Sequence, residues 1–359
     1  MDPAALRAEF PVLDRIAYLN AGTDGPVPRA AARAAAAEIE RQAADGRSGE
    51  HFGRMFGRRE ELRGACAALI GAAPDDVALT TSTSEGLATV VLGLGLRPGD
   101  EVVTSAVEHP GLLGALQAAR DLAGVTIRVV PFADVADAVT ARTRLVACSH
   151  VCWVDGRLAP DLRGLDVPVL LDGAQGAGAV ATDVAALGCD AYAGSGQKWL
   201  CGPDGLGLLW VSPALRERLA VTRRSYVSFA EPGAGLDAPL HETARRFDAP
   251  ALSSEALAFA VASHGVLAAA GWPAVHARAT ELASAFAARL AAAGRTVAPR
   301  GATTLVSFHS DGPAAEKERL AAQGVVVRDL PGLPLLRASV GAWNDEADLA
   351  RLAAALGAA

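Results

Sequence analysis

The chain has 359 residues, of which 51% are hydrophobic and 20% charged. This length suggests two domains, because a single core usually stops growing at roughly 250 to 300 residues. With 33 lysines and arginines against 40 acidic residues, the net charge is −7 and no basic block offers a surface for nucleic acid, so we expect no such partner. No apolar run approaches the roughly 20 residues of a membrane helix, so we expect no membrane partner.

The first residues and the cysteines bear on location and metal binding. No basic start followed by an apolar stretch indicates export, so the cytoplasm is the expected location. Five cysteines, at 66, 148, 152, 189 and 201, include no Cys-x-x-Cys pair and are expected to be free and mostly buried. Cys148, His150 and Cys152 lie close in sequence, but their side chains point different ways on a strand end, so we expect no metal.

The first 70 residues are predicted to be mainly helical. Asp2 followed by Pro3 is typical of a helix start. A turn-rich segment over 18–26 precedes helices at about 29–45 and 55–70.

From residue 77, strands and helices alternate. Strands are predicted at 77–80 and 101–105, with helices at 84–95 and 111–123. The alternation continues through 125–130, 135–141, 144–148, 167–171, 184–187 and 191–193. Short apolar strands separated by helices indicate a mostly parallel sheet covered on both faces, and therefore an α/β fold.

The remaining chain predicts a separate α/β layer. A strand at 206–211 and a long irregular segment over 223–250 precede helices at 253–270 and 273–293. Further strands are expected near 304–309, 325–328 and 335–340, with helices near 314–323 and 345–356. We expect a large domain over 15–252 and a small domain formed by 1–14 and 253–359.

An acidic residue and a lysine occupy successive strand ends. Asp172 directly follows the apolar run 169–171, at the edge of the sheet where α/β folds bind ligands, although alone it could equally cap a turn. Lys198 follows a strand of small residues, 191–196, which leaves room for a ligand. The pair matches the needs of pyridoxal phosphate (PLP), a lysine amine for an imine and a carboxylate for the pyridine nitrogen.

Two further features suit this cofactor. Residues 80–86 join a strand to a helix, so hydroxyls and free N–H groups converge at a positive helix end, although an ordinary N-cap has the same pattern. His109 follows the next strand and could stack on a flat ring, although a lone histidine in a turn is more often only solvated.

These residues resemble the class V branch of fold-type I PLP enzymes, which includes cysteine desulfurases, selenocysteine lyases, isopenicillin N epimerases and ergothioneine C–S lyases. The most specific match is Asp172-Gly-Ala-Gln175 with Ser195-Gly-Gln-Lys198, and the likeness runs from Tyr18 to the last helix. The resemblance implies the PLP-dependent transferase fold of type I, with a mostly parallel seven-stranded sheet and a smaller C-terminal α/β domain. It also implies PLP, an amino acid substrate and a homodimer.

The resemblance assigns a role to each matching residue. Lys198 would carry the cofactor, Asp172 would pair with the ring nitrogen, Gln175 would bind the phenolic oxygen and His109 would cover the ring face. The phosphate ligands would be Thr83, Ser84, Ser195 and Gln197. Arg337 would hold the α-carboxylate of the substrate through a bidentate fork, with His150 beside it.

Three positions depart from the desulfurase pattern. Gln197 stands where desulfurases usually have histidine. Ala249 follows 246–248, so the threonine that the family lends across the dimer interface is missing, and Ser253 or Ser254 are its candidate replacements. No cysteine follows Cys201, so the segment between residues 328 and 337 lacks the thiol that forms a persulfide.

Without that thiolate, desulfurase chemistry is disfavoured. A β-elimination lyase, an epimerase and an aminotransferase remain, with a non-catalytic binding protein as a further alternative. The stretches 197–203, 327–332 and 339–344 most resemble the ergothioneine branch, whose member cleaves hercynylcysteine sulfoxide. We therefore predict a C–S β-lyase for an S-substituted cysteine or its sulfoxide, giving thiol or sulfenate, pyruvate and ammonia. Residues 18–28 and 223–250 are expected to line the side-chain pocket.

Overall fold

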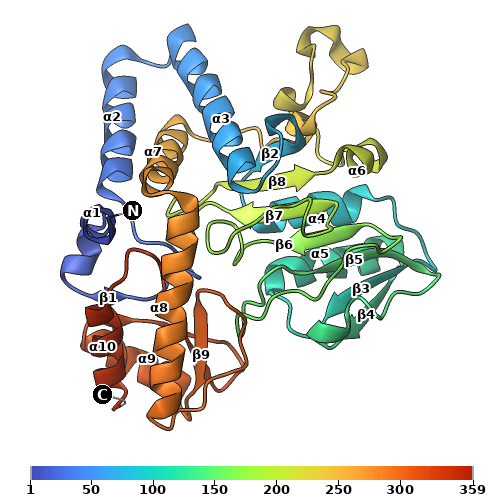
Figure 1. Ribbon diagram of the computed structural model, residues 1–359. Helices are drawn as coiled ribbons and strands as arrows, with labels where there is room; N and C mark the ends of the chain where they lie inside the picture. Colours follow the sequence, from blue (N-terminus) through green and yellow to red (C-terminus); the bar gives the residue numbers. More distant parts are fainter. Residues whose placement is uncertain (1, 358–359) are drawn as a thin grey trace.

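A seven-stranded sheet forms the centre of the computed structural model, which describes residues 2–357 (Figure 1). Its strands are β2 (Val77–Thr80), β3 (Glu101–Ser105), β4 (Thr126–Val130), β5 (Thr143–Ser149), β6 (Val169–Asp172), β7 (Ala191–Ser195) and β8 (Gly207–Val211). They lie in the order β2-β8-β7-β6-β5-β3-β4, and β8 alone runs antiparallel to the other six strands. The predicted α/β class with a mostly parallel sheet is confirmed.

Helices cover both faces of this sheet, which is why its strands are apolar on both sides. One face packs against α4 (Thr83–Gly93), α5 (Pro110–Ala123) and α6 (Pro213–Arg218) through leucines such as Leu87 and Leu112. The other face packs against α3 (Gly49–Leu69) and α7 (Ser254–Ala270) through Leu62 and Leu257. Between them, the two layers exclude water from the sheet and leave its carboxyl edge for a site.

The N-terminal helices flank the central layers. Asp2 caps α1 (Pro3–Ala8), its carboxylate accepting a hydrogen bond of 2.9 Å from the Ala4 N–H, as the sequence predicts. The alanine-rich α2 (Arg29–Asp45) packs along α7 and, with α3, extends from the body of the molecule (Figure 1).

The C-terminal residues build a second layer. Here α8 (Trp272–Ala292), α9 (Pro313–Ala322) and α10 (Glu346–Ala355) pack with an antiparallel sheet of order β11-β12-β9, formed by β9 (Leu305–His309), β11 (Arg328–Asp329) and β12 (Leu335–Ser339). This layer has a core of its own. The predicted domain boundaries at 14/15 and 252/253 stay a prediction, and residues 1 and 358–359 of that prediction lie outside the described residues.

The structure differs from the predicted elements in three places. Residues 325–328 are not one strand, because β10 (Val325–Val326) pairs with β1 (Ala17–Tyr18) while β11 pairs with β12. Residues 135–141 and 184–187 form turns and not regular elements. Val135 and Val184 are nevertheless buried in the core, which explains the apolar composition of these segments. The segment 223–250 contains three short 3-10 turns and forms the yellow projection in Figure 1.

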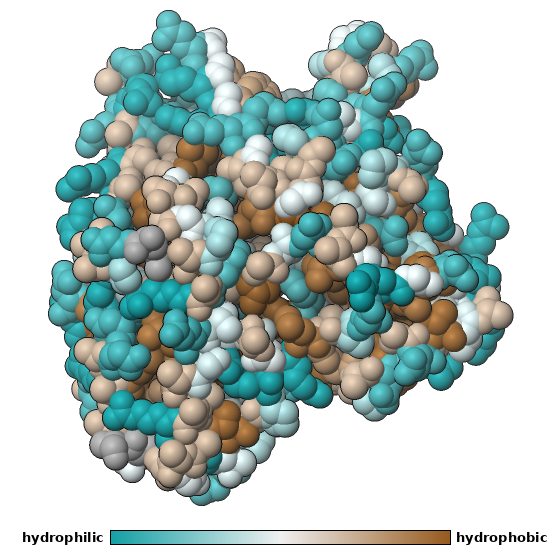
Figure 2. Space-filling model, in the orientation of Figure 1, coloured by the Kyte–Doolittle hydropathy of each residue, from teal (hydrophilic) through white to brown (hydrophobic). Residues whose placement is uncertain are grey.

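The surface and the helices bear on membrane association. Within residues 2–357 no single helix is long and apolar enough to cross a membrane. Only α7 and α8 taken together meet that test of length and composition, with an 80° bend between them. Figure 2 shows hydrophilic side chains over much of one face, and hydrophobic ones near the centre of the view.

Candidate active site

A cavity of about 270 Å³ lies at the carboxyl ends of β6 and β7. Nine of the ten residues predicted for the site line it: Thr83, Ser84, His109, Asp172, Gln175, Ser195, Gln197, Lys198 and Arg337. Eight of them lie at the carboxyl ends of β6 and β7, in the loops that follow these strands, or at the starts of α4 and α5, whereas Arg337 comes from β12 of the small sheet. The cavity is therefore built by both layers of the molecule.

Lys198 and Asp172 provide an amine and a carboxylate in this cavity. Burial, only partly offset by the charge of Asp172, lowers the pKa of Lys198 to about 8. Asp172 is 4% exposed, and burial raises its pKa while Lys198 and the Ala174 N–H oppose that shift. One carboxylate oxygen accepts a 2.9 Å hydrogen bond from Ala174 N, and the other accepts none from the described residues. Lys198 is one of only two lysines in the chain, the other being Lys317.

Hydroxyls and a helix N-terminus form one end of the cavity. Thr83 Oγ1 and Ser195 Oγ lie 2.6 Å apart, which joins the start of α4 to the end of β7. Ser82 caps α4, and the N–H groups of its first turn have no helical carbonyl to bind. Gly111 leaves space beside Ser84, because a Cβ atom at Gly111 would lie 2.6 Å from Ser84 Oγ. Free donors at a positive helix end suit a phosphate.

His109 presents a neutral ring to the cavity. Burial, followed by the positive charges of Lys198 and Arg337, lowers the pKa of His109 to about 4. Its Nδ1 accepts a 3.1 Å hydrogen bond from Gly111 N, and its ring meets Trp153 edge-on at 5.2 Å between centroids. These contacts fix the orientation of the ring.

Gln175 is held between the two layers. Its Nε2 donates to the Gly22 carbonyl at 2.7 Å, and its Oε1 accepts from Trp199 Nε1 at 3.0 Å. The second N–H of the amide remains available to a ligand oxygen. Gly22 is required at this point, since a Cβ atom there would lie 2.9 Å from both Gln175 Oε1 and Arg337 Nη2.

Arg337 is a buried guanidinium that the protein does not neutralise. It is 2% exposed, and burial lowers its pKa to about 9. Nη1 donates to the Trp153 carbonyl at 2.6 Å, but Nε is buried without a partner, and no carboxylate of residues 2–357 lies within 4 Å. An unpaired buried charge is costly, so the site is suited to an anionic ligand.

His150, the tenth predicted residue, does not line the cavity. It is buried, and its Nδ1 lies 3.1 Å from the Tyr192 hydroxyl. Burial lowers the pKa of His150 to about 4. The structure shows no contact that would support the predicted role of His150 beside the substrate.

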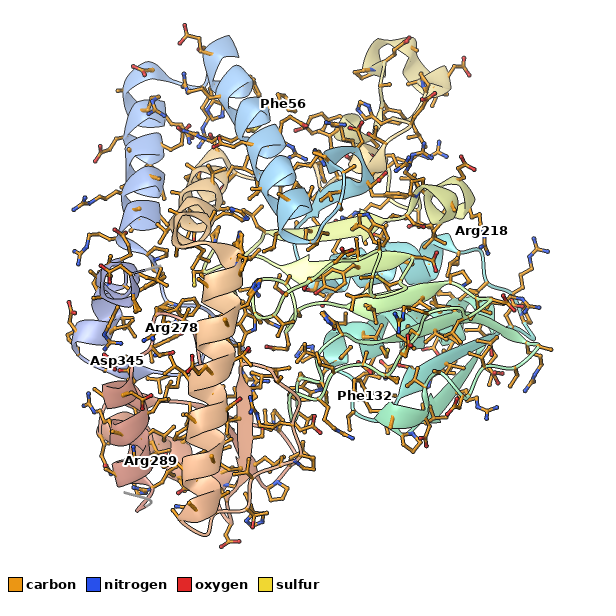
Figure 3. The ribbon with its side chains drawn as sticks, viewed as in Figure 1. Phe56, Phe132, Arg218, Arg278, Arg289 and Asp345 are labelled. Carbon is orange, nitrogen blue, oxygen red and sulfur yellow. The ribbon has the colours of Figure 1, made fainter. Side chains whose placement is uncertain are left out.

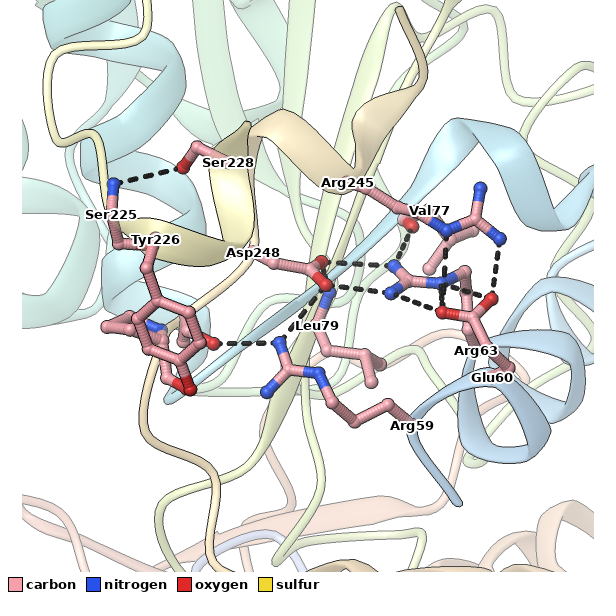
Figure 4. A network of polar contacts seen from close by, with 12 residues as sticks. Arg59, Glu60, Arg63, Val77, Leu79, Ser225, Tyr226, Ser228, Arg245 and Asp248 are labelled. Atoms are coloured by element: carbon pink, nitrogen blue, oxygen red, sulfur yellow. Dashed lines mark hydrogen bonds and ion pairs between the residues drawn. The ribbon is translucent and has the colours of Figure 1, made fainter. Parts of the chain in front are cut away.

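The expectation that residues 223–250 line the side-chain pocket is wrong for this cavity, since none of them reaches it. Asp248 instead accepts hydrogen bonds from Arg59 and Arg63 and from Leu79 N at 2.9 Å, which anchors the segment beside β2 (Figure 4). The candidate replacements for the missing threonine also lie elsewhere: Ser253 caps α7, and Ser254 donates to the buried Glu38 at 2.8 Å.

Among the cavity residues with a charged or aromatic side chain, three were not predicted individually for the site: Asp24, Trp153 and Arg328. Asp24 falls within the turn 18–28, the part of the predicted pocket that does line the cavity. Trp153 and Arg328 carry no motif, and only the pairing of β11 with β12 brings Arg328 opposite Arg337.

The donor set fits PLP. A lysine amine of lowered pKa, a buried carboxylate, a neutral flat ring and a hydroxyl-rich helix N-terminus match the aldehyde, ring nitrogen, ring face and phosphate of this cofactor. The buried Arg337 Nε without a partner adds a site for a carboxylate.

Comparison with known proteins agrees with this chemistry. The sequence model described as aminotransferase class-V matches residues 17–352. A probable cysteine desulfurase of Pseudomonas aeruginosa is 35% identical over 61% of this chain and 60% of its own length. The isopenicillin N epimerase of Streptomyces clavuligerus is 30% identical over 61% of this chain and 59% of its own length. The chain thus aligns with about three fifths of each of these relatives.

Solved structures match almost the whole chain. A lysine-to-alanine variant of C-DES, with glycine covalently linked to its PLP cofactor, superposes with a TM-score of 0.92 at 26% identity over 98% of both chains. The complex of the cystine C–S lyase C-DES with its reaction product cysteine persulfide gives a TM-score of 0.91 at 26% identity, over 97% of this chain and 98% of that one. The chain belongs to the aminotransferase class-V family, has the fold of PLP-dependent cysteine desulfurases and uses PLP as its cofactor.

Proposed function

We propose that this protein is a PLP-dependent C–S β-lyase. It would act on an S-substituted cysteine or its sulfoxide, of which hercynylcysteine sulfoxide is one example, and release a thiol or sulfenate, pyruvate and ammonia. The observation that carries the proposal is the hairpin between β11 and β12, which provides no thiol to the cavity.

This hairpin is short. Asp329 pairs with Leu336, and Leu330 N donates to the Leu335 carbonyl at 3.0 Å, so only a tight turn with Gly332 at φ 73° separates the strands. All five cysteines are buried, and none lines the cavity. Burial raises the pKa of Cys66 and Cys189 to about 12, which disfavours the thiolates that attack sulfur.

The structural neighbours support carbon–sulfur cleavage. C-DES, which superposes over nearly the whole chain, is described as a cystine C–S lyase. The match includes both layers of the molecule, whereas the curated desulfurases align with only part of their length. We infer the activity of the neighbour for this chain together with its fold.

The cavity residues would perform distinct tasks. PLP, when bound, supplies an electron sink for the pair left when the substrate Cα loses its proton. Lys198 would hold the cofactor, and its Nζ, once free, would accept that proton, because a pKa of about 8 leaves a useful fraction unprotonated near neutral pH. Asp172 would hold a proton on the ring nitrogen through its free carboxylate oxygen.

Other residues would position the reacting groups. Thr83, Ser84, Ser195 and Gln197 would bind the phosphate, with Gln175 on the phenolic oxygen. Arg337 would bind the α-carboxylate through its free Nε and Nη2 and so orient the Cα–H bond toward Lys198. His109 would cover the ring face, where its lowered pKa keeps it uncharged.

The second candidate is an amino acid epimerase, favoured by the 30% identity to isopenicillin N epimerase. Epimerisation needs a proton donor on the side of Cα opposite the base. An aminotransferase, a cysteine desulfurase and a non-catalytic PLP-binding protein remain as lesser alternatives from the same family.

Product analysis on a panel of S-substituted cysteines and their sulfoxides tests the proposal. The holoenzyme is expected to release pyruvate and ammonia from at least one member, and Lys198→Ala to release neither. Lys317→Ala is the matched control, because it removes the other lysine, which pairs with Asp329 outside the cavity. Solvent deuterium at Cα of recovered substrate, with inversion and no ammonia, would instead identify an epimerase.

A further inference from the structure

A buried carboxyl group lies beside the cavity and has no part in the tasks of the cavity residues. Glu108 is 4% exposed and does not line the cavity, although it immediately precedes His109. Its two oxygens lie 2.5 Å from Ser105 Oγ and 2.5 Å from Ser149 Oγ. Because these serines end β3 and β5, Glu108 ties the loop that carries His109 to the edge of the sheet.

The sheet places this carboxyl group next to Asp172. Ser149 and Asp172 are direct partners in the parallel pair of β5 and β6, so the hydrogen bond to Ser149 joins Glu108 to the strand position beside Asp172. Two other titratable groups belong to the same elements. His109 has a neutral ring, and burial, followed by the charges of Glu108 and Asp172, raises the pKa of the Cys148 thiol well above its usual value.

No cation balances a charge on Glu108. Among residues 2–357, no lysine, arginine or histidine nitrogen lies within 4 Å of its carboxyl oxygens. A serine hydroxyl donates or accepts a hydrogen bond, so Ser105 and Ser149 satisfy the group with or without its proton. An unpaired buried carboxylate is costly, and the neutral form avoids that cost. Burial raises the pKa of Glu108 to about 7 against the hydrogen bonds of the two serines, and the charge of Asp172 adds to the rise.

The other end of β3 provides a contrast. Glu101 is 2% exposed, and its Oε1 accepts hydrogen bonds of 2.9 Å from Thr140 Oγ1 and from Thr143 Oγ1. There, however, Arg142 Nη2 lies 3.5 Å from Oε2. Despite burial, the hydroxyls and the arginine lower the pKa of Glu101. The two buried glutamates of this region both have hydroxyl partners, but only Glu101 has a cation.

We propose that Glu108 is a positioning residue, a neutral carboxyl that holds His109 over the cofactor and leaves Asp172 as the single negative charge for the ring nitrogen. Its contacts with Ser105 and Ser149 fix the loop 106–109, which ends at the N-cap of α5. A second negative charge beside Asp172 would raise the pKa of that carboxyl and weaken its ability to leave the proton on the ring nitrogen. The inference concerns the cofactor site alone, so it holds for a lyase and for an epimerase alike.

Infrared spectroscopy of the substrate-free holoenzyme detects the proton directly. A protonated carboxyl has a C=O stretch at higher frequency than the amide bands, and this band should decrease in the wild type as the pH rises through about 7, where Glu108 ionises. Glu108→Gln should lack the change, whereas Glu101→Gln, the matched control, should retain it. A wild type without such a band, or a titrating band that persists in Glu108→Gln, would overturn the inference.

Two substitutions separate position from charge. Glu108→Gln keeps a neutral planar group that bonds both serines, so kcat/KM should stay within about twofold of the wild type near pH 6. The ratio of kcat in Glu108→Gln to kcat in the wild type should then increase as the pH rises through about 7, because only the wild type gains the second charge. Glu108→Ala removes the bridge and is expected to lower kcat about tenfold with KM near its wild-type value, since Arg337 still binds the α-carboxylate.

The other outcomes contradict the inference. Equal losses of kcat in Glu108→Gln and Glu108→Ala would show that the reaction requires a charged glutamate. No loss in either variant would show that Glu108 positions nothing. A loss in Glu108→Ala that falls on KM would show that the bridge acts on Arg337 and not on the cofactor.

Cofactor affinity provides a readout that needs no substrate. Ser149→Ala removes one hydroxyl partner and leaves Glu108 in place, which is a milder change than Glu108→Ala. Equilibrium dialysis of the holoenzymes should give a Kd for PLP that is raised about threefold in Ser149→Ala and about tenfold in Glu108→Ala. Glu108→Gln and the control Thr143→Ala, which removes a hydroxyl from Glu101, should bind PLP as the wild type does. Wild-type affinity in both Ser149→Ala and Glu108→Ala would overturn the positioning role.

Discussion

Two residues carry most of the chemistry assigned to this cavity, and each offers a direct test. Lys198 and Arg337 are both cations that burial shifts toward their neutral forms. Burying a cation without a partner costs free energy. A bound ligand offsets this cost in the cavity, an electrophilic aldehyde for the amine and a carboxylate for the guanidinium.

The lowered pKa of Lys198 predicts how the apoprotein takes up its cofactor. Only an unprotonated amine attacks the aldehyde of PLP, so the rate of reconstitution should be low below pH 7 and rise with pH, with a midpoint near the pKa of about 8. Stopped-flow absorbance gives the rate, and borohydride reduction followed by peptide mass spectrometry distinguishes Lys198 from Lys317. A rate that keeps rising toward the usual lysine pKa of 10.5 would show that burial does not act on this amine.

Removing the guanidinium of Arg337 should weaken substrate binding. Arg337→Ala is expected to raise KM by about 100-fold with a smaller effect on kcat, because the carboxylate of the substrate loses its charged partner. Arg337→Lys keeps the charge but not the fork, and should fall between the two. If KM in Arg337→Ala stays at the wild-type value, another residue binds the carboxylate.

At the scale of elements, a buried ionic cluster links helix, strand and loop. Asp248 lies near the end of the irregular segment 223–250, Arg59 and Arg63 belong to α3, and Leu79 belongs to β2 (Figure 4). Arg63 also donates to the Val77 carbonyl at 2.7 Å. Because the partners come from three elements, the cluster fixes α3 against the edge of the sheet.

Substitution of Asp248 should therefore destabilise the fold. Asp248→Asn keeps the shape but leaves the buried Arg59 without its carboxylate partner and Arg63 with only the half-exposed Glu60, and we expect the free energy of unfolding to fall by about 3–5 kcal/mol. Asp161→Asn, which breaks the exposed pair with Arg163, is the control and should change it little. Denaturant titration followed by circular dichroism measures both, and equal effects in the two variants would contradict the proposed importance of the cluster.

The elements were largely predictable because their periodicity reflects burial. The limits of β2 and β3 agree with the predicted strands, since short apolar runs between turn residues leave little ambiguity. The turns at 135–138 and 184–188 were not predictable as turns. Val135 and Val184 are buried in the core, and a buried apolar residue looks the same in the sequence whether it lies in a turn or in a regular element. Helix α3 begins at Gly49, six residues before the predicted start, because Gly49, Gly53 and Gly57 make its first turns a weak helix signal in the sequence.

Site residues were predictable where the local sequence shows both the motif and its place at a strand end or helix start. Lys198, Asp172 and Thr83 lie at strand ends or at a helix start, so the fold class alone brings them to one edge. Arg328 and Trp153 reach the cavity only through the pairing of β11 with β12 and the packing of Trp153 on His109. Contacts of that kind depend on tertiary structure and leave no local pattern.

At the scale of the whole molecule, the exposed hydrophobic side chains suggest a partner. Ile39 on α2 and Phe52 and Phe56 on α3 are 55%, 51% and 44% exposed. Phe52 and Phe56 are four residues apart, so they share one side of α3, and Figure 3 shows Phe56 on the part of this helix that extends from the body. The resemblance to two-fold dimers predicts that this surface meets a second copy.

We accordingly expect a homodimer in solution. Sedimentation equilibrium should give about twice the 36.6 kDa mass of one chain. Phe52→Glu combined with Phe56→Glu should shift the mass toward one chain, whereas Leu122→Glu, at another exposed apolar residue, should not. A wild-type mass of one chain would contradict the expectation.

The central claim concerns what leaves the substrate once Lys198 has taken the Cα proton. The most direct test is the ratio of pyruvate, ammonia and alanine formed from the S-substituted cysteine that the holoenzyme turns over fastest. Carbon–sulfur β-elimination predicts pyruvate and ammonia in equal amounts and no alanine. Alanine as the main product would show that sulfur is transferred by the desulfurase route, and would contradict the conclusion drawn from the short hairpin between β11 and β12.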